Sequence, residues 1–284
     1  MCASSRVTGE AADDVVEMTA SKENDRVAII ALNRRTVRNA VDGTTARALH
    51  AAFLAFDSDD SFDVAVLTGS GGVFCAGADL HSLSNPLVHP KTGVVTELAG
   101  VVDDPTLGPM GPTRLTLSKP VVAAVDGPAV AGGMELAAWA SVRVAAWDAV
   151  FGVFCRRWGV PLIDGGSFRL PRLVGGSRAA DLILTGRPLS GVEAEAIGFV
   201  NRLAPAGEPS LPTALDLASA MTRSPQACLR SDLASSRSAF DPADAAELDA
   251  IAREYELGLA TMRQTRLGAV ASFVDGAGRG GAPI

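Results

Sequence analysis

Short β-branched runs alternate with helical segments over the first two thirds of the chain. RVAIIALN (26–33), FDVAVLTGS (62–70) and KPVVAAV (119–125) have the composition of buried strands. Between the first two, residues 44–59 place apolar side chains at helical spacing. Strands that alternate with helices favour one sheet with crossover connections, so we expect an α/β fold.

The pattern changes near residue 205. From about 211 to 274 the apolar spacing is helical, with breaks at Pro225 and Pro242. We therefore predict a disordered tail over 1–12, an α/β core over 13–205 and a helical C-terminal region over 206–284. The proline- and glycine-rich segment 85–112 is predicted to be a mobile loop region.

Charge and cysteine usage exclude several classes of protein. The chain has 25 basic and 32 acidic residues, a net charge of -7, and only three lysines, which disfavours binding to nucleic acid or anionic lipid. The four cysteines are far apart, and the polar first residues do not resemble a signal peptide. We expect a cytoplasmic protein with reduced thiols and no membrane anchor.

Two loops rich in glycine and alanine each follow a strand and precede a helix: CAGAD (75–79) and AVAGGMEL (129–136). Such loops leave backbone N–H groups unpaired at a helix N-terminus, where they suit an anion. Two amides that converge from separate loops can form an oxyanion hole. The alternative is a purely structural role, in which the Gly132–Gly133 pair only allows a helix to pack closely on a strand. The spacing is compatible with both the oxyanion hole and the structural role.

Glu135 falls in the first turn of the helix that begins after the second loop. A carboxylate there can simply complement the helix dipole. In an apolar cleft its pKa would rise, and it could then serve as a general acid or base near neutral pH.

Four ordered blocks resemble the crotonase superfamily, typified by enoyl-CoA hydratases and isomerases. They are VFCAGADL (73–80), SKPVVAAVDGPAVAGGMEL (118–136), GGSFRLPRLVG (165–175) and LTGRPLSGVEAEAIGFVNRLAP (184–205). The resemblance implies a spiral of β-β-α units, with a C-terminal helical region that forms a homotrimer or a hexamer of two trimers. It also implies that the N–H groups of Ala78 and Gly132 stabilise the enolate of a coenzyme A thioester, and that Gly132 lacks a side chain because the thioester oxygen must approach there.

The same resemblance places coenzyme A along a set of residues from three segments. They are Ala40, Cys75, Ala76, Ala78, Asp79, Leu80 and Gly132. LNRRTVRNAV (32–41) is similar to a family segment in which proline stands at the position of Arg35, so Arg34 and Arg38 are candidate phosphate ligands, with solvated surface arginines as the alternative. A lysine that is frequent in the family after this block is His81 here.

The chain departs from the hydratase pattern at Cys155. Hydratases of the family carry a second catalytic glutamate at this position, and a thiol cannot replace it as a proton donor near neutral pH without activation. We interpret Cys155 as a packing residue. Asp164, later in the same segment, either takes the role of the missing glutamate or is an ordinary turn or cap residue before Gly165. The sequence is compatible with both interpretations.

We therefore expect an enzyme that hydrates or isomerises an enoyl-CoA, with Glu135 moving the proton alone or with Asp164. The alternative is a weakly active or non-catalytic acyl-CoA-binding homologue, because Cys155 replaces the second glutamate. The three histidines lack metal-ligand spacing, and GAGRGG (276–281) follows no strand, so we expect no metal and no bound cofactor.

Overall fold

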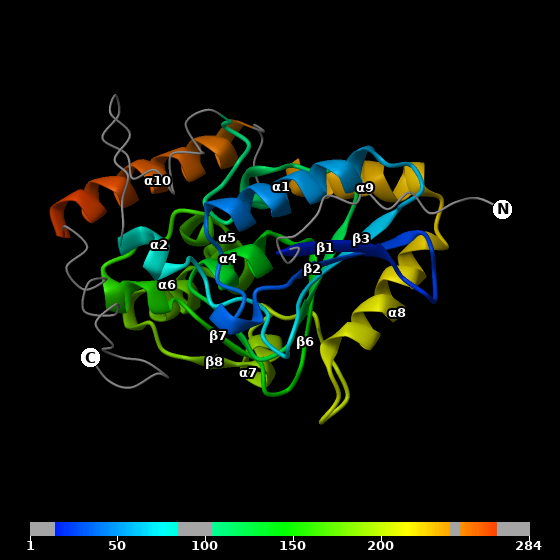
Figure 1. Cartoon of the computed structure of the whole chain (residues 1–284), viewed down its shortest axis with the longest axis horizontal. Helices are drawn as coiled ribbons and strands as arrows, with labels where there is room; N and C mark the ends of the chain where they lie inside the picture. The colour runs from blue at the N-terminus through cyan, green and yellow to red at the C-terminus, as the bar shows by residue number, and fades with distance from the viewer. Residues whose placement is uncertain (1–14, 85–103, 239–244, 266–284) are drawn as a thin grey trace.

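The larger of two sheets contains six strands, and it is mostly parallel (Figure 1). In the computed structural model, residues 15–84, 104–238 and 245–265 are described. Across the sheet the order is β1 (Val16–Ala20), β2 (Val27–Leu32), β3 (Val64–Gly69), β4 (Val121–Val125), β6 (Val142–Ala145) and β9 (Arg202–Leu203). Within this six-stranded sheet, the β1–β2 pair is antiparallel and the other described pairs are parallel. The three predicted strands appear as β2, β3 and β4.

The strand β1 was not among the predicted elements. It lies at the edge of the sheet, with Met18 opposite Ile30 of β2, and most of its residues are only half-buried or exposed. An edge strand with one covered face needs few apolar residues, so its sequence gives a weak signal.

Side chains alternate between the two faces of the sheet with the period of two that a strand imposes. In β3, Val64 and Val66 belong to a small apolar cluster, whereas Ala65 and Leu67 belong to the main core. Helix α8 (Ser210–Thr222) covers the small cluster, packing on β3, β4 and β6. The helix that borders the main core near β1 and β2 is α1 (Gly43–Ser58).

A second sheet contains the three strands β5 (Pro128–Val130), β7 (Val150–Gly152) and β8 (Leu189–Ser190). The chain passes from β4 in the larger sheet to β5 in the smaller one, and then forms α4 (Gly132–Trp139). It repeats this passage from β6 to β7, followed by the 3-10 helix η3 (Phe154–Trp158). This repeated path is the predicted spiral of β-β-α units.

Further helices complete the regular secondary structure of the described chain. They are α2 (Leu80–Ser84), α5 (Gly166–Val174), α6 (Gly176–Thr185), α7 (Gly191–Ala196), α9 (Gln226–Ser238) and α10 (Ala245–Thr265), with 3-10 turns η1 (Arg35–Val37) and η2 (Pro112–Arg114). Helix α10 packs on α5. Helical structure after residue 205 agrees with the prediction, whereas the division into a core and a C-terminal region stays a prediction.

Two predictions fall on residues that are not described. The predicted tail lies outside the described residues, as does most of the predicted loop region 85–112. The end of that region, 104–112, forms turns around a bridge between Gly108 and Gly111.

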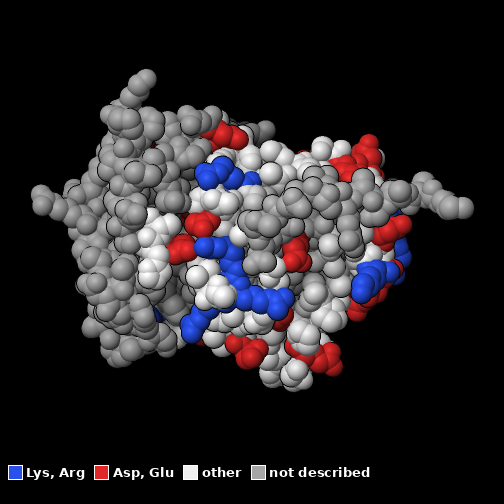
Figure 2. Space-filling model, viewed as in Figure 1, with Lys and Arg blue, Asp and Glu red and all other residues white. Residues whose placement is uncertain are grey.

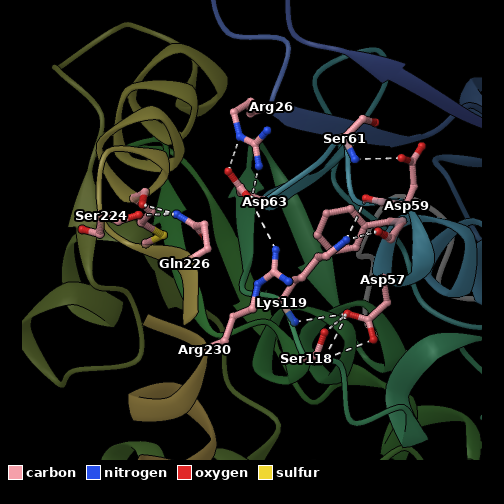
Figure 3. A network of polar contacts seen from close by, with 12 residues as sticks. Arg26, Asp57, Asp59, Ser61, Asp63, Ser118, Lys119, Ser224, Gln226 and Arg230 are labelled. Atoms are coloured by element: carbon pink, nitrogen blue, oxygen red, sulfur yellow. Dashed lines mark hydrogen bonds and ion pairs between the residues drawn. The ribbon is translucent and has the colours of Figure 1, made fainter. Parts of the chain in front are cut away.

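A polar network ties α9 and the end of α1 to the sheet (Figure 3). The carboxylate of Asp63 forms ion pairs with Arg26 and with Arg230 of α9. Lys119 is 1% exposed, and its Nζ donates to the carbonyl oxygens of Phe56 (3.0 Å) and Asp59 (2.8 Å). A buried ammonium thus adds a donor to two carbonyl groups at the C-terminus of α1, where the helix itself supplies few.

None of the helices in the described ranges combines the length and the hydropathy that a membrane span requires.

Candidate active site

The two glycine- and alanine-rich loops lie against each other. The Cys75 amide donates to the Pro128 carbonyl oxygen (3.0 Å), and the Val130 amide donates to the Cys75 carbonyl oxygen (3.1 Å). A Cβ atom at Gly77 would lie 3.2 Å from the Gly132 nitrogen, so the backbones of the two loops meet at that point. Strand β5 therefore brings the segment after β3 to the N-terminus of α4.

Two amides at this junction have no acceptor among the residues that the structure describes. Val41 pairs with the residues on either side of Ala78, donating to the Gly77 oxygen (2.8 Å) and accepting from the Asp79 nitrogen (2.8 Å). This parallel pairing leaves the Ala78 N–H pointing away from Val41. Within the described ranges, neither the Ala78 N–H nor the Gly132 N–H donates to a protein group.

Ala131, the residue before Gly132, has a strained backbone. Its φ is 55° and its ψ is -127°, a region that residues with a Cβ atom rarely occupy. The Ala131 N–H donates to the Gly152 oxygen (2.7 Å) and its own oxygen accepts from the Met134 nitrogen (3.0 Å). These bonds hold the turn that starts α4 and sets the direction of the Gly132 amide.

Packing accounts for the need for glycine at both positions 132 and 133. A Cβ atom at Gly133 would lie 2.2 Å from the Cys75 carbonyl oxygen. At Gly132 it would lie 2.5 Å from the sulfur of Met110, a residue that is 1% exposed. Close approach of neighbouring protein atoms is thus sufficient to explain the pair, and the approach of a thioester oxygen stays a prediction.

Glu135 is buried beside the junction. It is 4% exposed, and its Oε1 accepts from the amides of Asp164 (3.0 Å) and Gly166 (2.9 Å). Burial raises the pKa of Glu135 well above 4.5, and the charges of Asp164 and Glu254 raise it further, against the two amide hydrogen bonds. The carboxyl group therefore holds its proton more tightly than an ordinary glutamate does.

Asp164 lies next to Glu135, as the hypothesis of a second carboxylate requires. It is 2% exposed, and its Oδ1 accepts from the Met110 amide (2.9 Å) and the Thr113 hydroxyl (2.5 Å). Burial raises its pKa to about 6, although these hydrogen bonds and the charge of Arg114 act in the opposite direction. Asp164 thus fixes the 110–113 segment as well as adding a second titratable group to the site.

A third carboxylate, Glu254 of α10, was not predicted. It is 8% exposed; its Oε2 accepts from the Gly165 amide (2.5 Å) and its Oε1 from the Ser167 amide (2.6 Å). The sequence did hold a signal, because Glu254 stands at helical spacing between Ile251 and Gly258, which are also buried. An acidic residue on the apolar stripe of a helix indicates a specific partner.

Cys155 lies in η3 and belongs to the main apolar cluster, in agreement with its interpretation as a packing residue. Burial raises the pKa of its thiol to about 12, and the charge of Glu135 acts in the same direction. The thiol is therefore protonated near neutral pH and is a poor substitute for a carboxylic acid.

The predicted coenzyme A residues differ in burial. Ala40, Cys75 and Asp79 are buried, while Ala76, Ala78 and Leu80 are partly exposed. Burial raises the pKa of the Cys75 thiol to about 12, so it too is neutral.

The two candidate arginines differ in their surroundings. Arg34 forms ion pairs with Asp42 (2.8 Å) and Asp79 (3.2 Å) and donates to the Ala40 oxygen (2.5 Å), so its guanidinium is already engaged. Arg38 is exposed and has a left-handed backbone, with φ of 54°. Figure 2 shows basic side chains gathered near the middle of the face viewed in Figure 1, interspersed with acidic ones.

Among the described residues, no three His, Cys, Asp or Glu side chains are arranged so that they could hold a metal ion.

Known proteins resemble this chain in sequence and in fold. A family model described as enoyl-CoA hydratase/isomerase matches residues 22–265. An enoyl-CoA hydratase of Mycobacterium tuberculosis is 34% identical over 201 residues, which cover 68% of this chain and 70% of that protein. A mevalonyl-coenzyme A hydratase of Aspergillus fumigatus is 32% identical over 197 residues, 69% of each chain. A crystal structure of an enoyl-CoA hydratase from M. tuberculosis superposes with a TM-score of 0.72 and 30% identity, covering 88% of this chain and all of that one (100%).

Proposed function

The chain belongs to the enoyl-CoA hydratase/isomerase family, and we propose that it hydrates or isomerises the double bond of an enoyl-CoA thioester. One observation carries this proposal: within the described ranges the amides of Ala78 and Gly132 donate to no protein group, and the loops that hold them lie against each other at the start of the helix that carries the buried Glu135. The names of the relatives, several of them enoyl-CoA hydratases, support the same substrate class.

The two amides would act on the thioester carbonyl oxygen. As the reaction proceeds, electrons move from the double bond or from the C2–H bond onto this oxygen, and an enolate forms. Two backbone N–H donors fixed in a water-poor site stabilise that charge without having to reorient. Since neither donor has a protein acceptor among the described residues, both are available for the oxygen.

Glu135 would move the proton. In isomerisation its carboxylate takes a proton from C2 of a 3-enoyl thioester and returns it to C4, so that the double bond moves next to the carbonyl group. In hydration it takes a proton from water while the water oxygen bonds to C3, and then delivers a proton to C2. A carboxyl group with a raised pKa can serve as base and as acid in turn.

Asp164 and Cys155 bear on which of the two reactions prevails. Cys155 is a neutral thiol, so the second glutamate of the hydratases has no equivalent there. Asp164 is a buried carboxyl group beside Glu135, and burial raises its pKa to about 6. We infer that Glu135 carries out the proton transfer, and that Asp164 either shares it or positions the 110–113 segment.

Coenzyme A would bind along the 75–80 segment and Ala40, as proposed from the sequence. The exposed Arg38 suits a phosphate better than Arg34, which two carboxylates already engage. We further propose a cytoplasmic homotrimer or hexamer that holds no bound cofactor.

A second candidate function is acyl-CoA binding with little or no turnover. The neutral Cys155 favours it, because one proton-transfer group of the hydratases is missing. The buried, hydrogen-bonded Glu135 argues against it, since thioester binding does not require a titratable group at that place.

Two assays test the proposal. Wild type and Glu135→Gln are compared on crotonyl-CoA and on a 3-enoyl-CoA. We expect the variant to lose activity by about 10² to 10⁴-fold, the usual contribution of a general acid or base. Turnover that Glu135→Gln leaves unchanged would remove this residue from the mechanism, and thioester binding without turnover of either substrate would favour the second candidate.

A pair of variants tests the Gly132 amide. Gly132→Pro deletes the donor at the first position of a helix, where proline is tolerated, and Gly132→Ala keeps the donor while adding a Cβ atom that meets Met110. We expect the proline variant to be at least about 10²-fold less active than the alanine variant. Equal activities would show that the amide does not bind the oxyanion.

A further inference from the structure

Four consecutive backbone amides before and within the first turn of α5 are divided between two carboxylates. The Asp164 and Gly166 amides donate to Glu135, at 3.0 Å and 2.9 Å. The Gly165 and Ser167 amides between and after them donate to Glu254, at 2.5 Å and 2.6 Å. The segment 164–167 therefore lies between the two side chains, and each of them fixes alternate amides.

We propose that Glu254 of α10 is a positioning residue for Glu135: it holds the 164–167 backbone in the conformation whose amides orient the Glu135 carboxylate. The inference rests on the proposed function, in which Glu135 transfers the proton. Through this contact α10, distant in sequence from both loops, completes the site.

The local geometry makes such support necessary. Both amide hydrogen bonds of Glu135 fall on Oε1, and Oε2 accepts none within the described part of the chain. The direction of Oε2 thus depends on where the 164 and 166 amides lie. This stretch contains Gly165 with φ of 88°, and glycine pairs restrict the backbone little by themselves. Without Glu254, the Gly165 amide would be left without an acceptor in a buried place, and the amide of the more exposed Ser167 would lose the acceptor that fixes it.

Charge couples the two glutamates as well. The groups that face Glu135 are Asp164 before α5, Glu254 of α10 and the neutral thiol of Cys155 in η3. Arg114 of η2 acts on Asp164 from the other side. The negative charges of Asp164 and Glu254 add to burial in raising the pKa of Glu135. Removal of the Glu254 charge should therefore lower that pKa.

The test compares full-length wild type with Glu254→Gln across pH. In a plot of activity against pH, we expect the limb that reports the titration of Glu135 to move to lower pH by about 0.5 to 1 pH unit. The direction is the same whether Glu135 acts as acid or as base. We also expect kcat to fall by about 10-fold or more with KM within about 3-fold, because the change misplaces a catalytic group and not the thioester. Glu256→Gln, which removes an exposed charge from the same helix, is the matched control and should leave both unchanged.

Glu254→Asp separates charge from geometry. Its shorter side chain keeps the charge but cannot reach both amides, so kcat should fall while the pH limb stays in place. If circular dichroism shows that Glu254→Gln does not fold, Glu254→Asp still tests the positioning role through its effect on kcat.

A double variant tests whether Glu254 acts through Glu135. If it does, adding Glu254→Gln to Glu135→Gln causes no further loss of activity. An unmoved pH limb in Glu254→Gln, or a full additional loss in the double variant, would overturn the inference. In either case turnover of an enoyl-CoA by the wild type would leave the proposed function intact, whereas thioester binding without turnover of either substrate would refute the proposed function itself.

Discussion

Replacement of Asp164 by asparagine should remove a pH-dependent loss of stability. The carboxylate is buried, and its pKa rises from the usual 3.8 to about 6 in the folded protein. The folded state therefore binds the proton more tightly than the unfolded state does. The stability that this proton contributes is fully present below about pH 4 and is lost as the pH rises through about 6.

The size of the effect follows from the two pKa values. One pKa unit corresponds to 1.36 kcal/mol, so the interval from 3.8 to about 6 amounts to about 3 kcal/mol. Asparagine has nearly the same shape, and its carbonyl oxygen can still accept from the Met110 amide and the Thr113 hydroxyl. The variant should thus keep the local structure without carrying a buried charge at neutral pH.

The assay is urea unfolding, followed by circular dichroism, at several pH values between 4 and 7.5. We expect Asp164→Asn to gain stability relative to wild type as the pH rises, by about 3 kcal/mol over this range. Asp148→Asn is the control, because Asp148 is exposed. A difference between Asp164→Asn and wild type that does not change with pH, or that changes in the opposite direction, would refute the reasoning.

Three further substitutions test other parts of the structure. Ala131→Gly relieves the strained backbone before Gly132, and we expect the free energy of unfolding to rise by about 1 kcal/mol in thermal or urea denaturation; a decrease would argue against strain there. Lys119→Met removes the ammonium that donates to the Phe56 and Asp59 carbonyl groups, and the same measurement should show a loss of about 1 to 3 kcal/mol, which an unchanged value would contradict. Cys155→Ala should keep kcat/KM for crotonyl-CoA within about 3-fold, since a neutral thiol does not transfer the proton; a loss of about 100-fold would assign it a catalytic part.

Much of the fold could be predicted from the sequence because it depends on local patterns. The runs that became β2, β3 and β4 are strongly β-branched, and the helices after residue 205 have clear helical spacing with breaks at proline. The strand β1 could not be predicted, since its residues are half-buried or exposed and no run of buried apolar side chains marks it.

The site could be predicted only in part. Glu135 and the two loops belong to contiguous motifs, and the structure brings them together with Asp164. Glu254 reaches the site from α10, through a contact that spans 89 residues of sequence, and short-range spacing carries no information about such a contact. The engagement of Arg34 by Asp42 and Asp79 likewise depends on tertiary structure, and so it could not be foreseen from LNRRTVRNAV.

The division of the larger sheet into two apolar faces has a consequence for how the chain must be made. Val64, Val66 and Val122 turn to the side that Ala214 and Leu217 of α8 cover, so this layer is closed only after synthesis has passed residue 222. A nascent chain that stopped short of α8 would expose the valine side chains on one face of the sheet to solvent. Such an apolar surface is prone to self-association. Expression of fragments that end before residue 210 should therefore yield aggregates, and addition of the α8 segment should restore solubility.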